Sequence, residues 1–179
     1  MGAKPPSGYS GVQKALHWAM ALLIAGMLGV GLSLPRLTPG PLADVLYEVH
    51  KSTGMLVLAL ALARLAIRLR HGVPALDPAL PRWQRMAAGM SHAALYTLMI
   101  AMPVVGWIAT SACCRPVRFL WTVPATLPVP ADNAAAKWLF LLHLALGLAL
   151  IAIVAVHVAA ALHHHFVRRD DTLRRMLPR

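Results

Sequence analysis

The stretch WLFLLHLALGLALIAIVAVHVAAALHHHFV, residues 138–167, decides the fold. It contains no Asp, Glu, Lys or Arg, and it is bounded by Lys137 and Arg168. About 20 apolar residues suffice for a helix to cross the hydrocarbon core of a bilayer. The stretch therefore predicts a membrane-spanning helix.

Three further segments fit the same description. Residues 15–35 and 86–114 are also free of charged side chains. Residues 45–69 carry charged side chains only toward their ends, where long side chains reach the membrane interface, namely Glu48, Lys51, Arg64 and Arg68. We therefore predict an all-α fold, a transmembrane four-helix bundle that forms a single domain over residues 1–179. The helices are expected at about residues 12–34, 45–69, 86–110 and 137–166.

The composition excludes an ordinary soluble domain. Hydrophobic residues make up 59% of the chain, whereas soluble proteins contain about 45–50%. The formal net charge is +11, and the mean hydropathy is +0.64. Because the chain is so apolar, we interpret its excess of basic residues as contact with the membrane surface and not with nucleic acid. The 6 acidic residues lie at expected helix ends or in loops, so no buried carboxylate pair is available for acid–base catalysis.

Basic residues set the expected orientation, because Lys and Arg concentrate in cytoplasmic loops. With the N-terminus inside, 12 basic residues fall on the cytoplasmic side and 5 on the outer side. The outer residues are Arg36, Lys51, Arg115, Arg118 and Lys137. Both termini are therefore expected in the cytoplasm. The first apolar run lacks an A-x-A cleavage site, so we interpret it as a retained helix.

Besides the three consecutive histidines His163 to His165 at the end of the last span, five histidines fall inside the predicted spans: His17, His50, His92, His143 and His157. An ionisable side chain in a membrane span indicates function, because its burial is costly unless it is neutral, paired or coordinated. His143 and His157 share one face of the last helix, 14 residues or about 21 Å apart along its axis. The predicted topology places His50 near the outer level of His143, and His17 near the inner level of His157.

Two imidazoles from facing helices suit the axial positions of a haem b iron in a bundle core. We therefore predict two haem b groups, one between His50 and His143 and one between His17 and His157. A small residue follows each of these four histidines by one helical turn, as expected beside a flat macrocycle: Ala21, Gly54, Gly147 and Ala161. His92 is followed instead by Tyr96.

Other polar residues have more than one interpretation. His92 either replaces an inner ligand, contacts a propionate or substrate, or is structural. Arg64 and Arg68 either anchor the helix at the interface or pair with propionates of the inner haem. His164 continues the face of His157 and is the best placed of the three consecutive histidines to contact a quinone or a propionate.

The adjacent cysteines and the C-terminal segment are two further features of the sequence. The adjacent Cys113 and Cys114 bond to each other only with strain, so free thiols and a labile disulfide both remain open, most simply without a function. Residues 170–177 are expected to form a short amphipathic helix at the membrane surface, capped by Asp171 and Thr172.

The order and spacing of these residues resemble the bacterial di-haem cytochrome b561 family. The resemblance covers nearly the whole chain and is carried by Leu16-His17-Trp18, His50 with Gly54, Ala63-Arg64-Leu65, His92 with Tyr96, Pro103 with Gly106, His143 with Gly147, His157, and the tail His164-His165-Phe166. It implies a bacterial inner-membrane protein in which His17, His50, His143 and His157 ligate two haems. It also implies electron transfer with the quinone pool, such as ubiquinone, and in some members oxidation of superoxide.

Three functions are therefore compared. The leading prediction is an oxidoreductase-type electron carrier between an outer donor and the quinone pool. The second is a haem-bearing anchor subunit of a larger enzyme such as a hydrogenase. The third is a proton or metal transporter that uses the intramembrane histidines as a relay.

Overall fold

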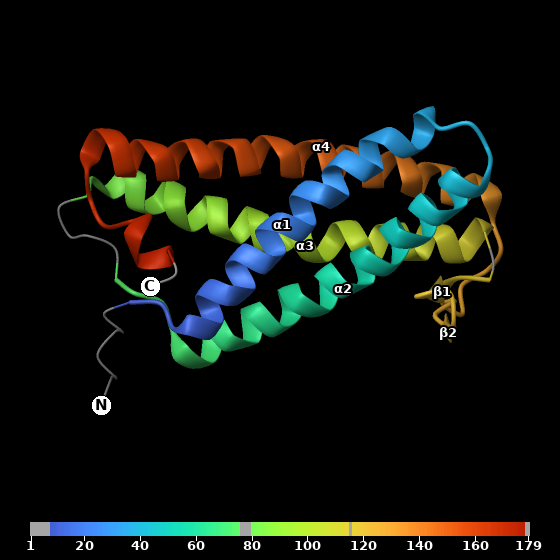
Figure 1. The fold of residues 1–179 in the computed structure, drawn as a ribbon, viewed down its shortest axis with the longest axis horizontal. Coiled ribbons are helices and arrows are strands. Elements are labelled where there is room, and N and C mark those ends of the chain that lie inside the picture. Colours follow the sequence, from blue (N-terminus) through green and yellow to red (C-terminus); the bar gives the residue numbers. More distant parts are fainter. Residues whose placement is uncertain (1–7, 76–79, 115, 178–179) are drawn as a thin grey trace.

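The computed structural model describes residues 8–75, 80–114 and 116–177; Arg115, counted above as an outer basic residue, lies outside them. Within the described residues, four long helices dominate (Figure 1): α1 (Gly11–Ser33), α2 (Pro41–His71), α3 (Arg82–Cys113) and α4 (Asn133–His163). Each is long and apolar enough to cross a membrane. The prediction of an all-α, membrane-spanning four-helix fold is confirmed.

Three helices begin four residues earlier than expected, at Pro41, Arg82 and Asn133. A charge-free run marks only the apolar part of a helix, whereas the helix itself extends out to its cap. Pro41 occupies the first turn of α2, where its missing N–H costs nothing. At α4, the carboxylate of Asp132 accepts from the backbone N–H groups of Ala134 and Ala135, at 2.9 and 3.0 Å.

The helices pack in sequence order, α1 on α2, α2 on α3 and α3 on α4. Figure 1 shows α3 and α4 running side by side, with the start of α1 and the segment after α4 at one end of the bundle and a small β-hairpin at the other. We name these the terminal end and the hairpin end. Met20, Val57, Ala61 and Met99 form a buried apolar layer between them, one residue from each of α1 and α3 and two from α2.

Residues 116–132 form an ordered loop at the hairpin end. Its strands are β1 (Arg118–Phe119) and β2 (Val123–Pro124), joined through Leu120 and Trp121, whose φ angles of 50° and 63° are left-handed. No sequence motif predicted this hairpin. Such φ angles are costly for residues other than glycine, so the turn must be held by its surroundings.

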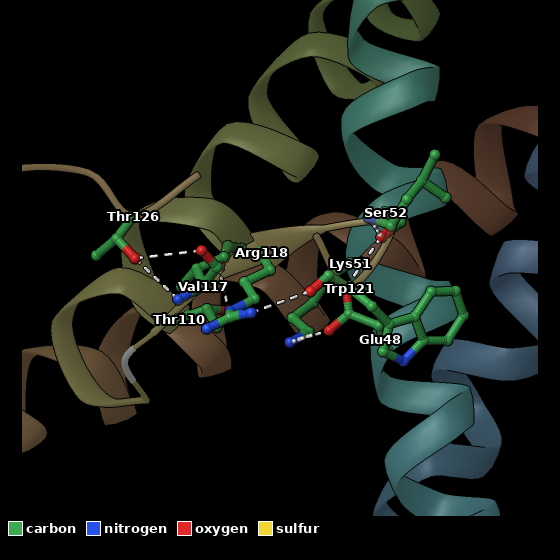
Figure 2. Close-up of polar contacts among 10 residues, drawn as sticks. Glu48, Lys51, Ser52, Thr110, Val117, Arg118, Trp121 and Thr126 are labelled. Atoms are coloured by element: carbon green, nitrogen blue, oxygen red, sulfur yellow. Dashed lines mark hydrogen bonds and ion pairs between the residues drawn. The ribbon is translucent and has the colours of Figure 1, made fainter. Parts of the chain in front are cut away.

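Contacts to α2 and α3 hold the hairpin in place, and the contact to α2 is drawn in Figure 2. The backbone N–H of Leu120 donates to the hydroxyl of Ser52 at 2.9 Å, and Ser52 donates to Glu48 at 3.1 Å. On the α3 side, the indole N–H of Trp107 donates to the carbonyl of Ala125 at 2.5 Å. The loop is therefore fixed to α2 and α3.

The chain after α4 turns back across the terminal end. A π-helical turn, η2 (His164–Arg168), leads to Arg169 at φ 57°, and a short 3-10 turn, η3 (Arg174–Met176), follows. The carbonyl of Met176 accepts from the indole of Trp18 at 2.9 Å. The tail therefore docks on α1 and does not form the separate amphipathic helix expected over residues 170–177.

Candidate functional site

His50 of α2 and His143 of α4 face each other at the hairpin end, with ring centres 6.1 Å apart. Both line a cavity of about 1180 Å³ that all four helices border, mostly with apolar side chains. This exceeds the roughly 300–1,000 Å³ typical of sites for drug-sized ligands. We name this cavity with its two histidines the hairpin site.

The ring separation fits two ligands on one iron. Because a metal–imidazole bond is about 2.0–2.1 Å long and a ring nitrogen lies about 1.1 Å from its ring centre, two imidazoles on opposite sides of an iron have centres about 6.3 Å apart. The separation of 6.1 Å between His50 and His143 matches this value. The hairpin site therefore fits a metal held between two imidazoles.

Hydrogen bonding at the two rings also fits. The Nδ1 atom of His143 lies 2.9 Å from the carbonyl oxygen of Met102 in α3, so the neutral ring donates there and leaves Nε2 free for a metal. Nδ1 of His50 is buried, and no hydrogen-bond partner lies near it among the described residues. A buried nitrogen without a partner is costly, and a bound ligand that repositions the ring would relieve that cost.

Glycines from the other two helices make room for both rings. A Cβ atom added at Gly31 of α1 would lie 2.9 Å from Cε1 of His50, and one added at Gly106 of α3 would lie 2.9 Å from Cε1 and Nδ1 of His143. Gly54 and Gly147, predicted to lie beside a macrocycle, line the same cavity. An added Cβ there would meet only Met27 and Met102, at 3.8 Å. An added Cβ at these two glycines would therefore make only ordinary van der Waals contact.

At the terminal end, α4 presents His157 to two other histidines. The ring centre of His157 lies 6.3 Å from that of His17 in α1 and 5.6 Å from that of His92 in α3. The first value matches the separation of two axial ligands, and the second is shorter. We name these three residues the terminal site.

Two arginines of α2 adjoin the terminal site. A guanidinium nitrogen of Arg64 lies 2.9 Å from Nδ1 of His17, and the guanidinium carbons of Arg64 and Arg68 lie 5.8 and 5.7 Å from the ring centre of Tyr96. Arginine only donates, so Nδ1 of His17 accepts and the proton of the neutral ring is on Nε2. Coordination of a metal by Nε2 of His17 therefore requires Arg64 to move away from this ring.

His164 turns toward the tail, where its Nδ1 atom lies 2.6 Å from the carboxylate of Asp170. Burial raises the pKa of Asp170, but hydrogen bonds from His164 and Thr172 outweigh it and hold that pKa well below its usual range. Arg168 adds a third contact to this carboxylate at 3.5 Å. His164 is thus part of the tail's anchoring cluster.

Two lysines at the rim of the hairpin site have different surroundings. Lys51 is paired with Glu48 at 2.7 Å, so its charge is compensated. Lys137 lines the cavity and is exposed.

Cys113 and Cys114, for which both oxidation states remained open, are joined in a disulfide and line the same cavity. The sequence did not reveal that Glu48 and Ser52 support the hairpin or that Gly31 lies against His50, because both roles depend on contacts between distant segments.

No three His, Cys, Asp or Glu side chains of the described ranges are grouped so as to hold a metal ion by themselves. The arrangement is instead one of facing imidazoles at two levels of a helical bundle. Fold and site together define a multi-pass membrane protein whose bundle interior is suited to metal-centred macrocycles.

Comparison with known proteins identifies the family. Residues 8–179 match the family model described as prokaryotic cytochrome b561. The chain is 35% identical to cytochrome b561 homolog 2 of Escherichia coli K12, covering 96% of this chain and 92% of that protein. It is 31% identical to homolog 1 of the same organism, covering 96% and 97%. It is 30% identical to the probable superoxide oxidase CybB of Yersinia pestis, covering 96% of each.

The chain therefore belongs to the prokaryotic cytochrome b561 family. It is a multi-pass bacterial membrane protein and a haem b electron carrier.

Proposed function

We propose that this chain carries electrons across the bacterial inner membrane with two haem b groups, one held by His50 and His143 and the other by His17 and His157. The observation that carries the proposal is the pair of ring separations, 6.1 and 6.3 Å, at two levels of one bundle. Bound haem supplies one-electron chemistry at each level.

The chain's own residues hold and shield these groups. The carbonyl of Met102 fixes the tautomer of His143, and Gly31 and Gly106 let both hairpin-site rings stand close to neighbouring backbone. At the terminal site, Arg64 and Arg68 are the cations available to haem propionates, with His92 beside them. We assign His92 a supporting role because the ring separation of His17 and His157, 6.3 Å, is the one that matches two ligands on one iron, whereas that of His92 and His157 is 5.6 Å.

We further propose superoxide as the donor at the hairpin end and the quinone pool, with ubiquinone as its member, as the acceptor. The relative named as a probable superoxide oxidase supports this choice of donor. Two superoxide anions give up one electron each, and one quinone takes both electrons with two protons. His164, anchored by Asp170 at the terminal end, is proposed to contact the quinone or a propionate. The chain would then be an oxidoreductase.

The proposed orientation puts the hairpin end outside and both termini in the cytoplasm. The distribution of basic residues, 12 against 5, supports it. Lys137 is then an exposed cation beside the outer cavity and attracts a small anion, whereas Lys51 is compensated by Glu48.

The relay-transporter alternative is disfavoured by the bundle interior. The buried apolar cluster of Met20, Val57, Ala61 and Met99 lies between the hairpin and terminal sites, and none of these four side chains can pass a proton. An electron crosses such a layer without a titratable group, but a proton does not.

The haem content of the purified protein tests the proposal. We expect a pyridine haemochrome assay to give two haems b per chain, extractable because the sequence has no C-x-x-C-H attachment motif. His71→Ala is the matched control, because His71 is exposed and hydrogen-bonds to the carbonyl of Ile67 in its own helix. A ratio near one, or no haem, would contradict the proposal.

A further inference from the structure

The disulfide between Cys113 and Cys114 lies at the end of α3, on the wall of the hairpin site. Cys114 is exposed and Cys113 is half-buried. The pair therefore meets solvent on one side and the cavity of His50 and His143 on the other. Cys113 also follows Gly106, the glycine against His143, by seven residues, which is two helical turns on the same face of α3.

This disulfide is poorly explained as a bond that stabilises the fold. Disulfides stabilise a fold mainly by closing long loops in the unfolded chain, and this bond closes a loop of two adjacent residues. The end of α3 is held by other contacts: the N–H of Cys114 donates to the carbonyl of Thr110 at 2.9 Å, and the N–H of Asp132 donates to the carbonyl of Ala112 at 3.1 Å. The bond can therefore open and close while the helix end stays in place.

Its position instead suits electron exchange. Exposed disulfides are the ones open to attack by external thiols, and disulfides persist on the outer side of the bacterial inner membrane. The proposed orientation puts Cys114 on that side. These are the two cysteines of the chain, so a reduced pair would react with no other thiol of the protein.

We propose that Cys113–Cys114 is a second redox centre of the hairpin site, which accepts electrons from an external dithiol and passes them to the haem held by His50 and His143. The inference rests on the proposed function, because that haem and the quinone pool are its electron acceptors. The substrate class is a small or protein-borne dithiol in the extracytoplasmic space.

The reaction balances in two stages. A donor thiolate attacks one sulfur of the pair, a mixed disulfide forms, and the second donor thiolate closes the donor's own disulfide, leaving Cys113 and Cys114 as thiols with the donor's two protons. The pair would then give up two electrons, in two one-electron steps, to the haem that His50 and His143 would hold, and would release two protons to solvent as its S–S bond forms again. A quinone takes up the two electrons with two protons.

Reduction of haem by a dithiol tests this proposal. Under anaerobic conditions, dithiothreitol should reduce the haem of wild type at least about tenfold faster than that of the Cys113→Ser/Cys114→Ser variant, because the exchange site is lost. Dithionite, which needs no thiol exchange, should reduce both proteins at equal rates. Equal rates with dithiothreitol in the two proteins would overturn the proposal.

A thiol count gives a second readout that does not depend on haem absorbance. Mass spectrometry after alkylation should find no free thiol in wild type as isolated and two after dithiothreitol. After removal of the reductant and addition of oxidised ubiquinone-1, the two thiols should disappear in wild type but persist in His143→Ala, which lacks the ligand of the nearby haem. Two thiols that persist in haem-loaded wild type would overturn the inference alone, whereas wild type without haem would overturn the proposed function first.

Discussion

Gly106 is the position at which the smallest change should disturb the hairpin site most. In Gly106→Ala the new methyl group would lie 2.9 Å from Cε1 and Nδ1 of His143. Ordinary contacts between carbon atoms are about 3.5–4.0 Å, so the ring must move by about 0.6–1.1 Å. The ring resists this movement because it donates to the carbonyl of Met102 in the same helix that carries the new methyl group.

The magnitude follows from overpacking. Extra methyl groups in packed interiors cost about 1–3 kcal/mol, which corresponds to about 5- to 150-fold weaker binding of the hairpin-site haem. Metal ligands must hold their positions to within about 0.5 Å, a tolerance that the required movement exceeds. Gly31→Ala should have the same direction but a smaller effect, because the ring of His50 is not held by a hydrogen bond at Nδ1.

Haem retention measures both effects. The haem content of each variant and its rate of haem loss to excess apomyoglobin should rank Gly106→Ala as most affected, then Gly31→Ala. The matched controls are Gly89→Ala on α3 and Gly29→Ala on α1, where an added Cβ meets nothing within 4 Å. Alanine favours helices over glycine by about 0.8–1.0 kcal/mol, so the controls should be neutral or more stable. Normal haem retention by Gly106→Ala would refute the packing argument.

Three further predictions concern the surroundings of the sites. In stopped-flow haem reduction by superoxide, Lys137→Gln should lower the rate and its salt dependence, whereas Lys51→Gln should change little because Lys51 is paired; equal effects would contradict this. Ser52→Ala should speed hydrogen exchange at Leu120 about fivefold, as loss of a hydrogen bond of about 1 kcal/mol predicts, with Ser33→Ala, whose hydroxyl bonds within its own helix, as the unaffected control. Asp170→Asn should expose the tail to trypsin at neutral pH. The pKa of Asp170 is lowered in the fold, so the tail of wild type should stay protected above about pH 4 and lose its protection only as the pH falls further. Hydrogen exchange in the tail measures this pH dependence.

The helices and the levels of the histidines were predictable because both depend on local sequence. A charge-free run fixes a span, and the 14 residues between His143 and His157 fix two depths on one helix. The structure brings together His50 with His143 and His17 with His157, as the spacing predicted. The assignment of these residues as haem ligands stays a prediction.

Contacts between distant segments were not predictable. Gly31 is one of 12 glycines, and only the crossing of α1 over His50 gives it a role. The hairpin depends on Ser52, which lies 68 residues before Leu120. The tail likewise depends on Trp18, 158 residues before Met176. A pattern that repeats every 3.6 residues reports on one helix at a time, not on which helix faces it.

Loss of haem from single-histidine variants tests the central claim most directly. Purified His50→Ala and His143→Ala should each retain one haem b and show the same remaining redox midpoint, and His17→Ala and His157→Ala should each retain the other haem with a different midpoint. His92→Ala should keep both haems. Loss of the terminal haem in His92→Ala with its retention in His17→Ala, or loss of different haems by His50→Ala and His143→Ala, would contradict the account.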